Sequence, residues 1–375
     1  MKKEETASPP FFMTVLCQNR FEQVREAMSA SGADSLVVTH LPNVSYLCGF
    51  SGSNAILLVL NDQMHLFTDG RYTIQAREEA PQARLHIVRT PLAEACGEYL
   101  QSHLPRKRAR VAFESSSLTV AEWGRLKKAA GRRIEWKSTN GLIERIREVK
   151  SAEELEVMRS SAKLASEVVT EAPDFVRPGV AELEVAAEID YRLRRKGATG
   201  PSFETIVASG PRSALPHARP TEKRLQKNEL VVLDLGAILR HYCSDLTRTV
   251  FLGRAPARIK RWYKAVEQAQ EAAHDVLRAG VTAGAVDRAA RRVLNKHGLG
   301  SYFVHGTGHG LGIEIHEGPR VGRKQKQEIR PGNVVTLEPG IYVEGVGGIR
   351  LEDEVAIHAN GTEVLTTAPR GLLEL

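Results

Sequence analysis

Short apolar runs alternate with helically spaced apolar residues through the first 140 positions of the chain. The two spacings, one apolar residue in two and one in 3.6, separate predicted strands from predicted helices. Strands are predicted at Ser35–Thr39, His65–Thr68, His86–Val88 and Arg110–Phe113, and helices at Arg20–Gly32, Arg71–Glu79, Leu92–His103 and Thr119–Ala130. A turn at Leu41–Asn43 and two strands that meet at Gly49–Ser53 complete the pattern. This alternation predicts an α/β domain.

The pattern changes after residue 150 and then occurs twice. A long helix is predicted to begin at Ser151, because Glu154 three residues later completes a capping box. Further on, Arg177–Val180 recurs as Arg278–Val281, and each copy continues into an amphipathic helix that ends at a glycine. Strand-like residues and an acidic hairpin follow in both copies. We expect two α+β halves related by a pseudo-twofold axis.

The length of 375 residues is sufficient for two domains with full cores. The predicted organisation is a flexible tail at residues 1–14, a first domain at 15–140 and a second at 141–375. The expected fold class is therefore an α/β N-terminal domain followed by an α+β domain with an internal duplication.

Two aspartates lie where strands are predicted. Asp234 interrupts the apolar run that starts at Leu230, and Asp245 precedes β-favouring residues that end at Phe251. A hairpin with its tip at Leu239-Arg240 would place the two aspartates opposite each other, although a longer loop or a bulge is an alternative. Two like charges in an apolar sheet persist only if a cation or a shared proton compensates them. The pair is thus predicted to bind metal.

A second acidic hairpin and a histidine-rich stretch extend this site. With a tip near Gly345, Glu338 lies opposite Glu352. Between the two hairpins, the stretch FVHGTGHGLGIEIHE contains three histidines: His305, His309 and His316. Two aspartates, two glutamates and one histidine suit a pair of divalent ions better than a single structural zinc.

The chain resembles a known family in these residues. The ordered set Asp234, Asp245, His309, Glu338 and Glu352 is similar to the five ligands of the pita-bread metallopeptidases. The motifs PSFETIVASG, SALPHA, LDLG, CSDLTRT, HGTGHGLG, IHE, LEPG and GIRLEDE resemble its proline-specific branch, which contains aminopeptidase P and prolidase. The run YLCGFSGSNA with LFTDGRYTIQA resembles the creatinase-type N-terminal domain of those enzymes.

The resemblance implies two divalent ions, with Mn(II) expected first and Co(II), Fe(II) or Zn(II) as alternatives. It implies that Asp245 and Glu352 bridge the ions, that Asp234 completes one site, and that His309 and Glu338 complete the other. Such ions lower the pKa of a bound water and polarise the scissile carbonyl.

The resemblance also implies residues that act on the substrate. Glu338 is expected to carry a proton from the nucleophile to the leaving nitrogen. His217, His305 and His316 are expected to hold the carbonyl oxygen and the proline side of the peptide. Arg350 is expected to orient a ligand or to contact the substrate.

The expected activity is that of an Xaa-Pro aminopeptidase, with an Xaa-Pro dipeptidase as the alternative. DGRYTIQA and SALPHA favour the first. A metal-free creatinase-like hydrolase and a non-catalytic pita-bread binding protein are more remote alternatives, and the complete ligand set argues against both. The expected partners are short peptides with proline at the second position, and the resemblance implies a homodimer.

Composition changes this prediction little. The net charge of +7 comes from dispersed basic clusters without interleaved aromatic residues, so nucleic acid is not an expected partner. No apolar run is long enough to span a bilayer, and no membrane association is expected. The N-terminus lacks the apolar core of a signal peptide, and the four cysteines show no CxxC spacing. These features predict a cytoplasmic protein with reduced thiols.

Overall fold

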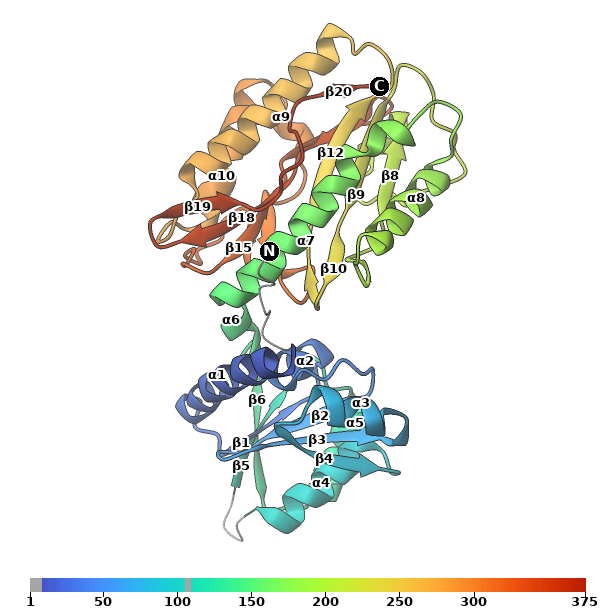
Figure 1. Ribbon diagram of the computed structural model, residues 1–375. Coiled ribbons are helices and arrows are strands. Elements are labelled where there is room, and N and C mark those ends of the chain that lie inside the picture. The colour runs from blue at the N-terminus through green and yellow to red at the C-terminus, as the bar shows by residue number, and fades with distance from the viewer. Residues whose placement is uncertain (1–8, 105–108) are drawn as a thin grey trace, which may run out of the picture. The chain divides into compact units, whose positions relative to one another are not determined.

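The computed structural model describes residues 9–104 and 109–375, with side chains from residue 19 onward (Figure 1). The expected tail at 1–14 therefore lies largely outside the described residues. The chain divides into two compact units, Met1–Ile146 and Arg147–Leu375.

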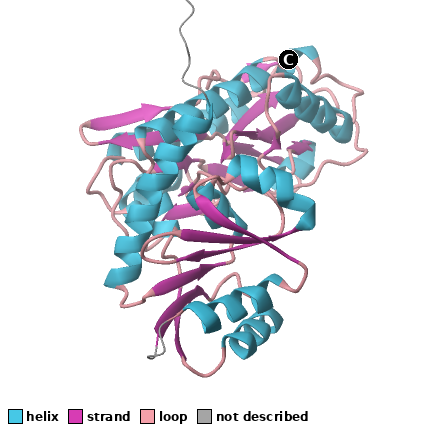
Figure 2. Cartoon of the chain, turned by 60° about the horizontal axis from the view of Figure 1, so that its bottom comes forward, coloured by secondary structure: helices cyan, strands magenta, loops and turns pink. Residues whose placement is uncertain are grey.

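The first unit contains one six-stranded sheet in the order β4-β3-β2-β1-β5-β6, whose strands lie side by side in the lower half of Figure 2. Strand β2 is antiparallel to both of its neighbours, and all other pairs are parallel. The strands are β1 Ser35–Val38, β2 Ala55–Val59, β3 Met64–Asp69, β4 Ala83–Val88, β5 Ala109–Glu114 and β6 Ile134–Thr139. The helices are α1 Pro9–Ala30, α2 Leu41–Cys48, α3 Thr73–Glu79, α4 Leu92–His103, α5 Val120–Ala130 and the short α6 Glu144–Arg147. This is the expected α/β pattern.

One local prediction in this unit is wrong. The turn at Leu41–Asn43 and the strand after it are instead the single helix α2. Pro42 is accommodated in the first turn, where its missing N–H leaves no hydrogen bond unmade. Val44, Leu47 and Cys48 are buried at helical spacing, and Gly49 ends the helix with φ of 80°. The apolar residues of this segment also fit the alternation of a strand, so the sequence pattern did not indicate the helix.

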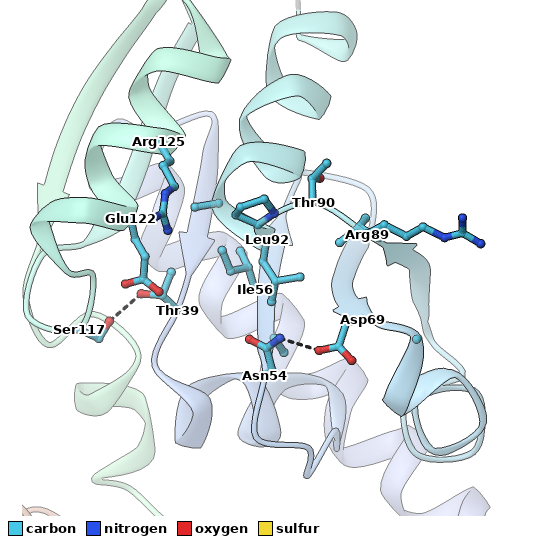
Figure 3. A pocket seen from close by; sticks show the side chains of 15 residues that line it. Thr39, Asn54, Ile56, Asp69, Arg89, Thr90, Leu92, Ser117, Glu122 and Arg125 are labelled. Carbon is cyan, nitrogen blue, oxygen red and sulfur yellow. Dashed lines mark hydrogen bonds between the residues drawn. The ribbon is translucent and has the colours of Figure 1, made fainter.

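A cavity of about 540 Å³ opens at the carboxyl ends of the parallel strands of the first unit (Figure 3). Thr39 follows β1, Asp69 ends β3 and Val88 ends β4, while Leu92 at the start of α4 lines the opposite side. The Asn54 side-chain amide donates to Asp69 Oδ2 at 2.6 Å. Strand ends and residues of α4 and α5 therefore line the cavity, at the edge where open α/β sheets generally bind ligands.

The second unit packs two pairs of helices against sheets that are antiparallel except where β20 pairs with β12 (Figure 1). The helices are α7 Ala152–Thr170, α8 Glu182–Arg195, α9 Ala257–Val276 and α10 Ala283–Lys296. A four-stranded sheet contains β8 Ile206–Ser209, β9 Leu230–Leu235, β12 Leu246–Phe251 and β20 Leu373–Glu374. A five-stranded sheet contains β13 Gly308–Gly310, β14 Glu317–Val321, β15 Val334–Leu337, β18 Asp353–His358 and β19 Gly361–Val364. Two smaller sheets contain β7 Gly200–Pro201, β10 Ala237–Leu239 and β11 Tyr242–Cys243, and β16 Gly340–Val343 and β17 Gly347–Arg350.

The predicted internal duplication is confirmed in the backbone. Helices α8 and α10 have 14 residues each, and each follows a glycine in the left-handed region, at φ of 92° and 82°. The N–H of Gly179 donates to Leu225 O, and that of Gly280 donates to Ile329 O. The predicted capping box of Ser151 at the start of α7 is also present.

The first acidic hairpin turns one residue later than predicted. Its tip is Arg240-His241, with φ of 47° and 72°, as in a two-residue turn that matches the twist of the strands. Thr247, and not Asp245, therefore lies opposite Asp234, so the predicted register is wrong. Because the partner moves by two positions, the side chain of Asp245 stays on the predicted face.

The second acidic hairpin has the predicted register. Val343 pairs with Gly347 beside the tip, Gly340 pairs with Arg350 at the other end of β16 and β17, and Leu337 pairs with Asp353 beyond them. Counting inward from both sides places Glu338 opposite Glu352. The expected continuous strands are nevertheless interrupted at these two glutamates, and the hairpin contributes to two separate sheets.

Cys48, Cys96 and Cys243 are buried, and among the described residues they form no disulfide. Among the described residues, no helix is long and apolar enough to cross a membrane.

We predict that acid destabilises the first unit through His65. This side chain is completely buried in β3, and its Nδ1 lies 2.9 Å from Nε2 of His86. Burial, together with the nearby charges of His86 and Arg84, lowers the pKa of His65 to about 4. A histidine with a lowered pKa stabilises the fold above the unfolded value of about 6.5, and this contribution is lost as the pH falls from there towards 4.

Urea unfolding at pH 7 and pH 5 measures this effect. Wild type should lose more stability between the two values than the His65→Leu variant. An identical loss in both proteins would show that His65 is not the group responsible.

Candidate metal centre

Four side chains from four separate segments converge in the second unit. One ligand atom each of Asp245, His309 and Glu352 lies within 4.8 Å of the other two. His309 Nε2 is 3.5 Å from Asp245 Oδ2 and 3.6 Å from Glu338 Oε1. Asp245 lies between β11 and β12, His309 in β13, and the two glutamates at the interruption of the second hairpin. The structure thus brings these predicted ligands together.

Glycines opposite the ligands allow this convergence. A Cβ at Gly236, which lies opposite Asp245, would be 1.8 Å from Ser244 O. A Cβ at Gly308, next to His309, would be 1.9 Å from Thr336 O. Any larger residue would separate the backbones that carry the ligands, so both positions require glycine.

The carboxylates of the site are buried and repel one another. Burial, followed by the charges of Glu352 and Asp234, raises the pKa of Asp245 well above its usual value. Burial and the charges of Glu338 and Asp234 do the same for Glu352. Burial raises the pKa of Glu338 to about 7, which Arg350 opposes. Protons or metal cations must compensate such a group of carboxylates.

His309 is arranged to donate a lone pair. Burial and the neighbouring His316 lower the pKa of His309 to about 4, so the ring is neutral near pH 7. Its Nδ1 lies 3.1 Å from Gly310 O and therefore carries the proton. The unprotonated Nε2 faces Asp245 and Glu338, as expected of a metal-binding imidazole.

Asp234 has one oxygen that the protein does not satisfy. Its Oδ2 accepts a hydrogen bond from Arg350 at 2.5 Å, whereas the buried Oδ1 has no hydrogen-bond partner among the described residues. An unpaired buried carboxylate oxygen is costly. A cation next to Oδ1 would remove that cost, so the chemistry of the donor set fits divalent metal ions.

Arg350 connects this site to the expected substrate side. Its guanidinium donates to Asp234, to the hydroxyl of Tyr342 at 2.8 Å and to Pro216 O at 3.0 Å. The Tyr342 hydroxyl also lies 2.9 Å from His305 Nε2. Arg350 is only 3% exposed, so its charge acts on the site with little screening by solvent.

The three histidines expected on the substrate side differ in burial. His305 lies in the loop before β13, and burial and Arg350 lower its pKa to about 4. His217 and His316 are exposed, and the charge of His217 contributes to lowering the pKa of both His305 and His316. The ring of His316 packs edge-on against His309, with centroids 4.4 Å apart. All three therefore lie around the carboxylate cluster.

Two residues of the site were not predicted from the sequence. Thr247 donates its hydroxyl to Glu352 Oε2 at 2.6 Å and lies 3.1 Å from Arg350 Nε. The buried Glu354 accepts the backbone N–H of Asp245 at 2.8 Å. The correct hairpin register would have indicated Thr247, because it lies opposite Asp234. For Glu354, the only indication in the sequence was its place at the end of three consecutive acidic residues.

Comparisons with known proteins identify the family of the chain. A model of metallopeptidase family M24 matches residues 156–359, and a model of the creatinase/prolidase N-terminal domain matches residues 20–149. The first match covers more than half of the chain. The chain therefore belongs to metallopeptidase family M24 and is a peptidase.

Individual relatives match along the whole length. An Xaa-Pro dipeptidase of Pyrococcus furiosus is 34% identical over 357 residues, which cover 95% of this chain and 100% of the relative. The solved structure of an Xaa-Pro dipeptidase from Bacillus anthracis has a TM-score of 0.91 at 34% identity and covers 96% of this chain and 100% of that one. An X-Pro aminopeptidase from Thermotoga maritima has a TM-score of 0.88 at 32% identity, with coverages of 95% and 99%.

We predict that metal binding depends on the buried carboxylates. The Asp245→Ala and Glu352→Ala variants should bind little metal after dialysis and should have no measurable peptidase activity, because both remove charge from the centre of the cluster. Elemental analysis beside an activity assay measures both quantities. Glu156→Ala, an exposed position on α7, serves as the control and should behave as wild type. Undiminished metal content in both site variants would contradict the assignment.

Proposed function

We propose that this protein is a dinuclear metal-dependent Xaa-Pro dipeptidase, a prolidase. The supporting observation is the full-length likeness, through both units, to Xaa-Pro dipeptidases that are 34% identical. The motifs of the sequence favour an Xaa-Pro aminopeptidase, and the likeness to the aminopeptidase from Thermotoga maritima keeps this activity as the second candidate. We further propose a cytoplasmic homodimer, on the family resemblance alone.

The charge of the site favours two metal ions. Four carboxylates face one buried guanidinium, that of Arg350, so the side chains alone carry a net charge of −3 (four negative, one positive) when ionised. One divalent ion would leave the site negative, whereas two make it slightly positive. The five residues that would hold the ions are Asp234, Asp245, His309, Glu338 and Glu352. Bound there, preferentially as Mn(II), the ions supply a Lewis acid for the scissile carbonyl and an acidified water.

Glu338 is proposed to carry the proton. Its carboxylate lies 3.6 Å from His309 Nε2, inside the ligand cluster, where it can accept a proton from a bound water and release it again. It would take the proton from the attacking water and deliver it to the leaving nitrogen. In an Xaa-Pro bond this nitrogen belongs to the proline ring and has no N–H before cleavage, so it needs a proton donor and no acceptor.

The histidines are proposed to divide the remaining work. His217 and His316 are exposed and would contact the proline side of the peptide directly. The Nδ1 of His305 lies 2.7 Å from Gly306 O and carries the ring proton, so its Nε2 accepts the hydrogen bond from the hydroxyl of Tyr342. His305 and Arg350 therefore hold that hydroxyl between them, and we propose that it would face the scissile carbonyl of a bound peptide.

We predict hydrolysis of Xaa-Pro dipeptides and little hydrolysis of longer peptides. Mass spectrometry of the products of Ala-Pro, Ala-Pro-Ala and Ala-Ala, with and without added manganese, tests this specificity. Only Ala-Pro should be cleaved efficiently, and only with metal. Comparable cleavage of Ala-Pro-Ala would establish the aminopeptidase instead, and cleavage of Ala-Ala at the same rate would exclude a requirement for proline.

We predict that Glu338→Gln lowers kcat by roughly 10²–10⁴-fold, the usual contribution of general acid–base catalysis. The amide keeps the shape and one ligating oxygen but cannot relay a proton at neutral pH. His305→Ala should instead weaken substrate contacts while both metals remain bound. Metal stoichiometry measured beside kcat and KM separates the two effects. If Glu338→Gln retains both metals and a near-wild-type kcat, the proton transfer belongs to another group.

A further inference from the structure

Two carboxylates outside the metal centre are completely buried in the second unit. Glu182 begins α8 and Asp287 lies in the second turn of α10, and both are 0% exposed. Neither belongs to the predicted site. The two helices are equivalent in the internal repeat, yet the position of Glu182 corresponds to Ala283 and that of Asp287 to Ala186. Each half thus forms its helix with alanine where the other has a buried charge, so the fold itself does not require these carboxylates.

Asp287 holds the loop that carries His305. Its Oδ1 accepts hydrogen bonds from the hydroxyl of Thr307 at 2.9 Å and from the N–H of Thr307 at 3.2 Å. Both of its oxygens also accept from the guanidinium of Arg291, at 2.8 Å and 3.1 Å. The carboxylate is therefore fully hydrogen-bonded and charge-balanced, which makes its geometry rigid.

Arg291 extends this hold to the backbone on both sides of the histidine. It donates to Phe303 O at 2.9 Å and to His305 O. Its guanidinium also stacks 4.1 Å from the centroid of the Phe303 ring, and that ring packs edge-on against His305. The ion pair of Asp287 and Arg291 on α10 thus fixes three positions of this loop, namely 303, 305 and 307.

The same ion pair reaches the proposed proton carrier. Thr307 O accepts the backbone N–H of Glu338 at 2.7 Å. Asp287 therefore fixes, through Thr307, the segment in which Glu338 leaves strand β15. No other contact of the His305 loop described above joins it to a catalytic carboxylate.

Glu182 holds the loop that carries His217 in a corresponding way. Its Oε1 accepts from the N–H and the hydroxyl of Ser209, both at 2.8 Å. Its Oε2 accepts from Arg212 at 3.0 Å and from the N–H and the hydroxyl of Thr221 at 3.1 Å and 2.8 Å. These donors lie on both sides of His217 in the chain, so one buried carboxylate closes the loop around it.

We propose that Asp287, with Arg291, and Glu182, with Arg212, are positioning residues: each buried ion pair fixes one histidine of the substrate side, His305 and His217 respectively. The inference rests on the proposed function, in which these histidines act on an Xaa-Pro peptide. Displacements of about 1 Å cost on the order of 10²-fold in rate, and groups that orient active-site residues commonly contribute about 10–100-fold. The two ion pairs are therefore part of the specificity of the site.

A crossed double-mutant cycle on the metal-loaded enzyme tests the proposal. Asp287→Asn should lower kcat/KM for Ala-Pro by about 10–100-fold in wild type and by a clearly smaller factor in the His305→Ala background. The loss that remains in that background is the part that acts through Thr307 on Glu338. Glu182→Gln should show the same pattern with His217→Ala and should keep its full effect in His305→Ala. Metal stoichiometry should remain at the wild-type value throughout. A merely structural role predicts equal losses in both backgrounds, and that result would overturn the proposal.

A second readout does not depend on activity. Histidine ring NMR signals of the metal-free full-length protein are assigned from His305→Ala and His217→Ala. Asp287→Asn should shift or broaden the His305 signal and leave that of His217 unchanged, and Glu182→Gln should do the reverse. Unmoved signals in both variants would refute the positioning role. If wild type hydrolyses no Xaa-Pro peptide, the proposed function fails, while the NMR result still decides the positioning.

Milder variants cover the case in which a charge-removing substitution does not fold. Thr307→Val removes one hydrogen bond to Asp287, and Thr221→Val removes one to Glu182. The same crossed pattern is expected, with smaller effects. Identical effects of both valine variants on both histidine signals would again contradict the proposal.

Discussion

The two halves of the second unit bring carboxylates close together, and the mutual repulsion of these carboxylates is the main constraint on its structure. Asp245 and Glu352 come from different halves, and both have strongly raised pKa values because each is buried near the charge of the other side. Folding without a cation would require protonation of these groups. The metals of this peptidase family are therefore part of the energetics of the fold and not only of the chemistry.

The backbone around the ligands follows from this constraint. Each acidic hairpin keeps one register along its length but is divided into two sheets at the ligands. In a continuous, flat strand, successive side chains point to alternate faces of the sheet. A carboxylate on such a strand could not point towards the other half of the unit. The interruption at Gly236 and at Glu338-Pro339 turns the strands so that the ligands converge.

The sequence predicted the parts of this arrangement that depend on local chemistry. The capping box at Ser151, the repeat and the register at Gly345 all follow from short-range patterns, and the structure has them. The tip of the first hairpin was misplaced because Arg240 and His241 adopt positive φ without the glycine or asparagine that usually marks such a turn. Helix α2 was missed because its apolar spacing satisfies two periods at once. Arg291 lies four residues after Asp287 on α10, which a helical pattern could indicate. Thr307 and the partners of Glu182 lie in distant loops, and no local pattern could indicate them.

The carboxylates of the metal centre differ from the buried carboxylates that the protein pairs with arginines, and the difference locates the function. Asp287 pairs with Arg291, Glu182 with Arg212, and Asp353 with Arg248 and Arg370. The charges of these groups are balanced by arginines of the protein itself, within hydrogen-bonded networks. Four carboxylates around His309 share the single charge of Arg350 instead. A buried site that the protein leaves negatively charged selects for cations from solution, and the balanced pairs around it keep the loops in place when those cations bind.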